Sequence, residues 1–202
     1  MTSKPAPSSP ARERLMATAE RLFYDRGIRA VGVEEVAAEA ATTKMSLYRH
    51  FPSKDALVAE VLRARDARYW TGWWDATVAK HPGDPRRQLE ALFEEIGART
   101  TRPGYRGCPF TNAAVEFPEP GHPGRAVAAA NKRELRRRLA ALAKAARARD
   151  PGLLADQLVL LAEGAYAIGQ TLPDDNPART IASAARALLA AAISPQRGQS
   201  KL

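Results

Sequence analysis

The chain has 202 residues, of which 45% are hydrophobic and 26% are charged, and its formal net charge at pH 7 is +9. This balance is typical of a soluble globular protein, and the length allows one or two domains with a buried core. The single cysteine, Cys108, excludes a disulfide framework within one chain and indicates a reducing, cytoplasmic location.

We expect neither a secretory signal nor a membrane span. The opening residues lack an apolar core, and no apolar run approaches the roughly 20 residues that a membrane span needs. Residues 1–11 are rich in Pro, Ser and Ala, which predicts a disordered N-terminal arm. A helix follows, and Gly27 is expected to cap its C-terminus. Its apolar stripe consists of Leu15, Ala19, Leu22 and Phe23.

The stretch from Val33 to Lys54 predicts two short helices separated by a tight turn. The apolar face of the first consists of Val33, Val36, Ala37 and Ala40. Ala41-Thr42 makes the break, and Thr42 is expected to cap the second helix. The inward side chains of the second helix are expected to be Thr43, Leu47 and Phe51.

The opposite arc of the second helix has an unusual composition for a solvent-facing surface. It carries Lys44, Met45, Tyr48 and Arg49. Such side chains offer cations for phosphates, donors for base edges and an apolar tip for a thymine methyl group. The pattern therefore indicates either a helix-turn-helix, whose second helix lies in the DNA major groove, or an ordinary two-helix corner with a solvated polar face.

Residues 12–63 resemble the N-terminal domain of the TetR/AcrR family of bacterial transcriptional regulators. The resemblance rests on RERLMATAERLFYDRGIRAVGVEEVA at 12–37, on SLYRHFPSKDAL at 46–57, and on the short turn between them. It implies that the second helix reads DNA and that Lys54, at the next helix N-terminus, binds a phosphate. The residues expected to contact DNA are Thr43, Lys44, Met45, Ser46, Tyr48, Arg49, His50 and Lys54.

This sequence departs from the family pattern in three places. Gly32 stands where a capping Ser or Thr is usual before the first of these two helices, and Ala41-Thr42 replaces the usual Gly and aliphatic residue of the turn. Met45 stands where small residues are common, so the base preference of relatives does not carry over.

The rest of the chain predicts further helices and no strand. Ser53 is expected to cap a helix that begins at Lys54 and continues to about residue 79. Later helices are expected at 85–101, 123–149, 152–171 and 178–193, following Asp84-Pro85, His122-Pro123, Asp150-Pro151 and Asn176-Pro177. The predicted fold is all-α. It has a helix-turn-helix DNA-binding domain at 12–56, a larger helical ligand-binding and dimerisation domain at 57–194, and a disordered C-terminal tail at 195–202.

The segment 102–124 combines aromatics, a thiol, an amide and a carboxylate with many Pro and Gly residues, which suits the rim of a ligand pocket. The candidate ligand contacts are Trp70, Trp74, Phe93, Cys108, Phe110, Asn112, Glu116, Phe117, Tyr166 and Gln170. Aromatics at helical spacing are more often core residues, so these positions remain open between pocket and core. An inducer pocket as such is what the family resemblance implies.

The last two helices suggest a dimer surface of four helices under two-fold symmetry. One seam consists of Leu154, Leu158, Leu161, Ala165 and Ile168, and the other of Ile181, Ala185, Leu188 and Ala192. The alternative is that both seams are used inside one chain.

Three other kinds of site receive little support. A nucleophile formed by Cys108, His122 and Asn112 would require side chains that the sequence does not bring together. The three histidines form no recognised metal-ligand spacing with Cys108, and no glycine-rich loop of nucleotide-binding spacing occurs. We therefore expect neither an enzyme nor a cofactor.

The expected function is a homodimeric, ligand-responsive transcriptional regulator, acting as a repressor, that binds a pseudo-palindromic double-stranded operator and is released by a small molecule. One alternative is a non-specific DNA-binding protein that uses the basic run at 132–149. Another is an enzyme acting on a small hydrophobic substrate.

Overall fold

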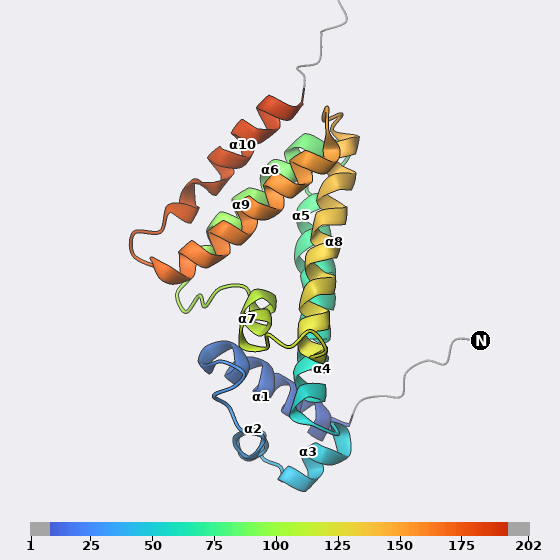
Figure 1. Cartoon of the computed structure of the whole chain (residues 1–202), viewed down its shortest axis with the longest axis vertical. Coiled ribbons are helices and arrows are strands. Elements are labelled where there is room, and N and C mark those ends of the chain that lie inside the picture. Colours follow the sequence, from blue (N-terminus) through green and yellow to red (C-terminus); the bar gives the residue numbers. More distant parts are fainter. Residues whose placement is uncertain (1–8, 194–202) are drawn as a thin grey trace, which may run out of the picture. The chain divides into compact units, whose positions relative to one another are not determined.

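The computed structural model describes residues 9–193, and that part of the chain is built from helices, as predicted (Figure 1). The elements up to residue 78 are α1 (Pro10–Arg26), α2 (Val33–Glu39), α3 (Lys44–His50), α4 (Lys54–Arg68), the π-helix η1 (Tyr69–Trp74) and α5 (Asp75–Val78). The later elements are α6 (Pro85–Thr100), α7 (Pro109–Glu116), α8 (Pro123–Ala145), α9 (Pro151–Thr171), the 3-10 turn η2 (Pro177–Thr180) and α10 (Ile181–Ala192).

The chain forms two compact units that do not coincide with the expected boundary at residue 56. The first unit runs to Ala67 and also includes Pro109–Ala129, so α7 belongs to it together with α1, α2, α3 and most of α4. The second unit contains Arg68–Cys108 and the chain from Ala130 onward. Two helices, α4 and α8, therefore run through the boundaries between the units.

Most helix starts follow from local sequence. Asp84, Asp150 and Asn176 each cap the element that begins at the following proline, accepting hydrogen bonds from the N–H groups of Arg87, Leu153 and Ala178 at 2.9–3.0 Å. At the start of α8 the Nδ1 atom of His122 accepts from the Gly124 N–H at 3.1 Å. A histidine thus takes the capping role that an aspartate or asparagine takes elsewhere.

Several boundaries differ from the predictions. The arm and tail predicted at 1–11 and 195–202 lie largely outside the described residues, but α1 already begins at Pro10 because Ser9 caps it. The helix predicted at 123–149 ends at Ala145, since Arg147 takes a left-handed backbone conformation with φ +59°. The segment 102–124, expected to form the rim of a ligand pocket, contains α7.

Each unit has its own core. The largest fully buried side chains of the first unit are Leu15, Leu22, Leu47, Phe51 and Leu57. Those of the second unit are Leu89, Leu92, Phe93, Ile96, Leu135, Leu139 and Leu154. Each such side chain contributes about 1.5–3 kcal/mol through burial, so these residues largely determine where the helices pack.

Helix α9 is long and apolar enough to cross a membrane by length and composition alone. It packs on α6 and α10, and Leu154, Leu158 and Ala162 are fully buried on the packed face. A helix in the core of a helical domain meets the same length and composition test.

Candidate nucleic-acid interface and effector site

Helix α3 is held by one apolar face and one cap. Leu47 and Phe51 are buried to 0% and 1% exposure, as predicted. The cap, however, is Thr43 and not Thr42: the Thr43 hydroxyl accepts from the Ser46 N–H at 3.1 Å. The Thr42 N–H instead binds the Ala37 carbonyl at 2.9 Å and closes the end of α2. The prediction that Thr43 points inward was therefore wrong, and its side chain is exposed.

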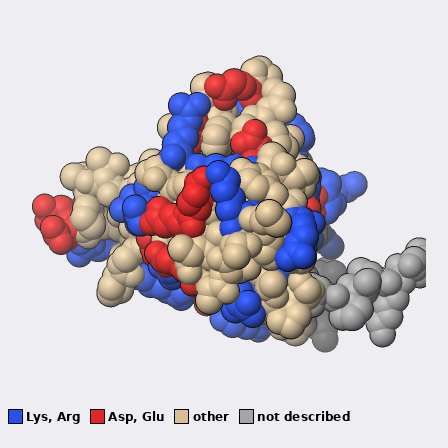
Figure 2. Space-filling model, turned by 90° about the horizontal axis from the view of Figure 1, so that it is seen from below, with Lys and Arg blue, Asp and Glu red and all other residues tan. Residues whose placement is uncertain are grey.

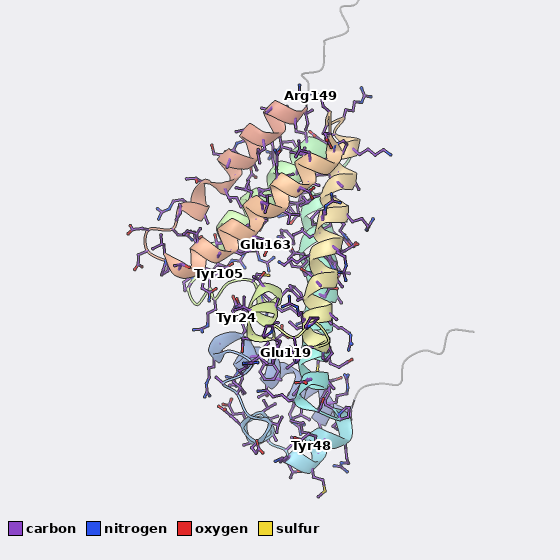
Figure 3. All side chains as sticks on the ribbon, in the orientation of Figure 1. Tyr24, Tyr48, Tyr105, Glu119, Arg149 and Glu163 are labelled. Carbon is purple, nitrogen blue, oxygen red and sulfur yellow. The ribbon has the colours of Figure 1, made fainter. Side chains whose placement is uncertain are left out.

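The outward face of α3 carries the residues expected there. Met45 is 77% exposed and Tyr48 is 42% exposed, and Lys44 and Arg49 are also exposed (Tyr48 is labelled in Figure 3). An apolar methionine tip standing free on a seven-residue helix contributes nothing to burial within its own unit. The face is therefore available for contacts with a partner.

The turn between α2 and α3 places a non-glycine residue in a left-handed conformation. Ala41 has φ +50°, and its N–H binds the Ala38 carbonyl at 3.0 Å. Glycine is the residue that takes this conformation without strain. The sequence departure at Ala41 thus falls on the residue that sets the turn.

Acidic residues of α2 are paired with cations around the exposed face. Glu34 binds Lys44, Glu35 binds Arg26 and Glu39 binds Arg21. The hydrogen bond with Lys44 lowers the pKa of Glu34, and the same bond raises the pKa of Lys44. Figure 2, which views the molecule from the α3 end of Figure 1, shows Lys and Arg interleaved with Asp and Glu. A phosphate approaching Lys44 has to compete with Glu34.

The residues expected to bind the DNA backbone have different surroundings. His50 lies with its Nε2 atom 3.4 Å from the Ser9 hydroxyl. Lys54 begins α4 next to Ser53, whose hydroxyl accepts from the Ala56 N–H at 3.1 Å, and burial lowers the Lys54 pKa. Ser46 is only 7% exposed, because it lies on the packed side of α3. The exposed face therefore does not include Ser46.

Helix α7 is fastened to the end of α1 by Glu116. The Glu116 carboxylate accepts from the N–H groups of Ile28 at 3.0 Å and Arg29 at 2.6 Å. Glu116 was predicted to contact a ligand; both of its carboxylate oxygens bind backbone groups just after Gly27, and the ligand contact stays a prediction. Together with Asn112 it borders a small cavity of about 30 Å³ within the first unit.

His122 is also occupied within the first unit. Its ring stacks on Phe117 with centroids 3.7 Å apart, and its Nε2 atom lies 3.3 Å from Asp55. Cys108 has a partner of its own, Lys132. These contacts give no support to a Cys–His nucleophile, and no group of three or more His, Cys, Asp or Glu side chains suited to a metal occurs in residues 9–193.

The second unit contains an aromatic cluster centred on η1. Trp70 and Trp74 are 7% and 5% exposed, and the guanidinium of Arg138 lies over both rings, 4.5 and 5.8 Å from their centroids. Arg138 is also paired with Asp75 at 3.0 Å and with Glu134 at 2.7 Å. A cation between rings and carboxylates is held in place by both kinds of contact.

A second part of this cluster surrounds Lys132. Its ammonium lies 3.2 Å from the Cys108 sulfur, binds Glu163 and lies over the Tyr166 ring at 5.6 Å. Burial by itself would lower the pKa of Lys132, but Cys108 and Glu163 outweigh it and raise that pKa. Burial also raises the pKa of Tyr166. Tyr105 joins the cluster by donating to the Tyr166 carbonyl at 3.3 Å (Figure 3).

The predicted ligand contacts do not form one set. Phe110, Asn112, Glu116 and Phe117 belong to the first unit, whereas Trp70, Trp74, Phe93, Cys108, Tyr166 and Gln170 belong to the second. Phe93 is a core residue at 1% exposure, and Gln170 is exposed to solvent. The side chain of Gln170 lies on the exposed side of α9, and its contact with a ligand stays a prediction.

Sequence reasoning missed five residues of the second-unit cluster. These are Tyr69, Trp73, Arg99, Lys132 and Arg138. The run YWTGWW drew attention to the tryptophans, but nothing local in sequence links them to cations on α6 and α8.

Four of the eight cations in the basic run at 132–149 pair with carboxylates. Lys132 pairs with Glu163, Arg136 with Asp156, and Arg137 and Arg138 with Glu134. The pairing with Arg137 lowers the pKa of Glu134 to about 2. This pairing leaves less positive charge for non-specific DNA binding than the sequence suggests.

The dimer seams need correction. Leu154, Leu158, Ala165, Ile181 and Ala185 are buried at 5% exposure or less within the single chain. They pack α9 and α10 against each other and against α6. The opposite face of α9 is exposed instead, with Leu153 at 55% and Leu160 at 72%. The alternative in which the chain uses the seams internally is correct for these five residues.

The comparisons with known proteins agree with this geometry. Residues 15–61 match the family model described as bacterial regulatory proteins, tetR family, and residues 85–185 match the tetracyclin repressor-like C-terminal domain. The chain is 46% identical over 89 residues to the HTH-type transcriptional repressor KstR2 of Mycolicibacterium smegmatis, covering 43% of this chain and 42% of that protein. The matches thus span only about half the length of such curated relatives.

Solved structures extend the similarity to nearly the whole chain. SCO4454, a TetR-family transcriptional regulator from Streptomyces coelicolor, is 31% identical with a TM-score of 0.85, over 93% of this chain and 98% of that one. A TetR-type regulator from Streptomyces avermitilis is 33% identical with a TM-score of 0.81, over 92% and 98%. The second family model alone spans half of the sequence. The chain belongs to the TetR family of bacterial transcriptional regulators.

Proposed function

We propose that this chain is a homodimeric repressor that binds a pseudo-palindromic operator through α3 and leaves it when a small organic effector binds the second unit. The observation that supports DNA reading most directly is the outward face of α3, with Met45 and Tyr48 exposed on a helix anchored by Leu47 and Phe51. The repressor role is supported by the KstR2 repressors among its relatives.

The proposed groove contacts are Lys44, Met45, Tyr48 and Arg49, and the proposed backbone contacts are Thr43, His50 and Lys54. Ser46 is omitted from the set because it is buried. Each side chain that reads a base contributes about 1–3 kcal/mol of discrimination, whereas the backbone contacts fix the position of the helix and depend on salt.

The dimer surface that we propose is the exposed stripe of α9 and the exposed small side chains of α10. On α9 the stripe contains Leu153, Leu160, Gly164 and Ala167, and on α10 it contains Ala184, Ala187 and Ala191. A Cβ atom built at Gly164 would have nothing within 4 Å, so the surface there is open to a second chain. A symmetric pair would present two α3 helices to major grooves about 34–36 Å apart.

Effector control requires a physical link between the two units. Helices α4 and α8 both cross from one unit to the other along the chain, the first near Ala67 and the second near Ala129. A ligand that binds one arrangement of the second unit better than another shifts the equilibrium between these arrangements. The size of that shift cannot exceed the difference between the two binding free energies.

The test begins with selection of an operator from random DNA, followed by fluorescence anisotropy at fixed salt. We expect Lys44→Ala and Tyr48→Ala each to weaken operator binding by about 5- to 150-fold, the equivalent of about 1–3 kcal/mol. Lys144→Ala, an exposed cation on α8, is the matched control and should retain wild-type affinity. Unchanged affinity of both α3 variants would disprove the assignment of the reading face.

The same experiment separates the two alternatives. A non-specific DNA-binding protein would show steep salt dependence, no sequence preference and a loss of affinity in Lys144→Ala. The enzyme alternative is opposed by membership of a family of transcriptional regulators.

A further inference from the structure

Two buried hydrogen-bond donors of the second unit have no acceptor. The Nη1 atom of Arg99 and the Nε1 atom of Trp73 are both inaccessible to solvent and make no hydrogen bond within the described part of the chain. Buried donors are almost always paired, because an unpaired one loses its bonds to water without replacement. These two donors of the second unit therefore lack an acceptor that the described residues could supply.

The two donors belong to the same cluster. The Arg99 guanidinium lies over the Trp73 ring at 5.2 Å and over the Tyr69 ring at 5.8 Å. The side chains of Arg99 and Trp73 are only half-buried, so the site lies beneath the surface of the second unit and not deep in its core. Tyr69, Trp70, Trp73 and Trp74 are the aromatic residues of η1, and π-helical turns of this kind occur frequently at functional sites.

The charges of the cluster specify the sign of the missing partner. Lys132 is paired with Glu163, and Arg138 with Asp75 and Glu134. Arg99 has no carboxylate partner among residues 9–193, which leaves one uncompensated positive charge. Guanidinium and indole N–H groups only donate hydrogen bonds, and a guanidinium matches the fork of a carboxylate.

The cations that already lie over the rings disfavour a cationic ligand. An aromatic box can bind a quaternary ammonium group, but the faces here already have resident cations: Arg99 over Tyr69 and Trp73, and Arg138 over Trp70 and Trp74. Ring contacts within η1 are close, with the Tyr69 centroid 4.6 Å from that of Trp73 and 4.7 Å from that of Trp70. These surroundings favour a flat apolar body next to the acceptor group.

We propose that Arg99 and Trp73 form the anion-binding end of the effector site, and that the effector is a small organic acid with a flat apolar body. This proposal rests on the proposed function, in which the second unit binds the effector. Arg99 binds the carboxylate, the Trp73 indole donates a further hydrogen bond, and the aromatic residues of η1 contact the body of the molecule.

The test uses pairs of acids and their neutral amides as probes: benzoate with benzamide, and indole-3-acetate with indole-3-acetamide. Binding to the full-length protein is measured by isothermal titration calorimetry. All three tryptophans of the chain lie in η1, so their fluorescence independently reports binding at this segment. We expect at least one acid to bind at least tenfold more tightly than its amide, and benzyltrimethylammonium to bind more weakly than either.

Variants then assign the contact. Arg99→Gln should weaken acid binding at least tenfold. Trp73→Phe should also weaken it, because phenylalanine keeps an aromatic ring but lacks the indole N–H. Arg102→Gln changes an exposed arginine close in sequence and should leave acid binding unchanged. Because Arg99→Gln could also disturb packing, the melting temperature without probe is measured for Arg99→Met. If Arg99 serves ligand binding and not stability, Arg99→Met should have a melting temperature no lower than that of the wild type.

Three results would overturn the proposal: neither acid binding more tightly than its amide, the cation binding best, or Arg99→Met melting lower while Arg99→Gln leaves acid affinity intact. Addition of the bound acid to the protein–operator complex distinguishes this proposal from the wider function. If acid binding depends on Arg99 but the acid does not release DNA, the acid-binding site stands. The proposal that its ligand releases the operator is then wrong.

Discussion

Ala41 and Lys44 are the residues on which the DNA-reading end of the chain depends most. Ala41 sets the direction of α3 through a left-handed backbone, and Lys44 stands at the first position of α3 in an ion pair with Glu34. Both features are local, and each can be changed without disturbing the core.

At position 41, replacement of alanine by glycine should stabilise the protein. The left-handed conformation costs a non-glycine residue about 1–2 kcal/mol, whereas the added freedom of glycine in the unfolded chain costs about 0.4–1 kcal/mol. Ala41→Gly should therefore raise the free energy of unfolding by about 0.5–1 kcal/mol in urea titrations. Ala38→Gly, at an exposed helical position of α2, is the control and should lower it by a similar amount. A loss of stability in both variants would contradict the assigned turn.

Neutralising Glu34 should tighten DNA binding. Glu34 holds Lys44 in an ion pair and adds a negative charge next to the proposed DNA-reading face of α3. Glu34→Gln should lower the operator Kd several-fold at low salt, and the gain should shrink as salt screens the charges. Glu95→Gln removes an equivalent ion pair with Lys80 in the second unit and should not change the Kd. Equal Kd values for wild type and Glu34→Gln across the salt series would contradict this view of Lys44.

Among the elements, α7 connects the middle of the sequence to the reader. It lies in the first unit although it follows α6 of the second, and Glu116 binds the backbone just after α1. Gly27 has φ +91°, a backbone conformation that favours glycine, whereas the space there would admit a Cβ atom, which would stand 3.6–3.7 Å from the Glu116 oxygens.

Loss of the Glu116 charge should destabilise the first unit. Charge-assisted hydrogen bonds contribute about 1.5–3 kcal/mol each, and an amide at this position keeps only one acceptor oxygen for two N–H groups. Glu116→Gln should therefore lower the free energy of unfolding by about 1–3 kcal/mol. Glu119→Gln is the matched control, since Glu119 forms only an exposed pair with Arg29 at 3.6 Å. The account of α7 fails if the two substitutions have the same effect.

The elements also show what the sequence could and could not predict. Proline starts, Asp and Asn caps and the apolar face of α3 depend on neighbouring residues, so they were predicted correctly. The π-helix at Tyr69–Trp74 and the position of Arg99 over Trp73 depend on contacts between distant segments. Burial of Leu154 and Leu158 within the chain was only an alternative for the same reason: an apolar stripe does not tell which neighbour covers it.

At the scale of the whole molecule, the account requires a symmetric dimer formed through α9 and α10. Leu160, at 72% exposure, lies in the middle of the proposed surface. Burying such a side chain against a second chain contributes about 1.5–3 kcal/mol, and a charge in its place would be left without a partner.

Leu160→Glu should convert the dimer to a monomer in analytical ultracentrifugation and weaken operator binding, because one α3 helix then addresses only one half-site. Val115→Glu introduces the same charge at a side chain of α7 that is 76% exposed, outside the proposed surface, and should remain dimeric. A dimer that survives in Leu160→Glu would place the interface elsewhere.

The central claim is that the outward face of α3 reads base pairs, and parallel selection from random DNA with wild type and Met45→Ala tests it most directly. We expect both proteins to select two half-sites about 34–36 Å apart. The variant should lose the preference for one or two base pairs in each half-site and keep the others, since Met45 stands exposed at the centre of that face. Identical base preferences for the two proteins, or no preference in either, would contradict the account.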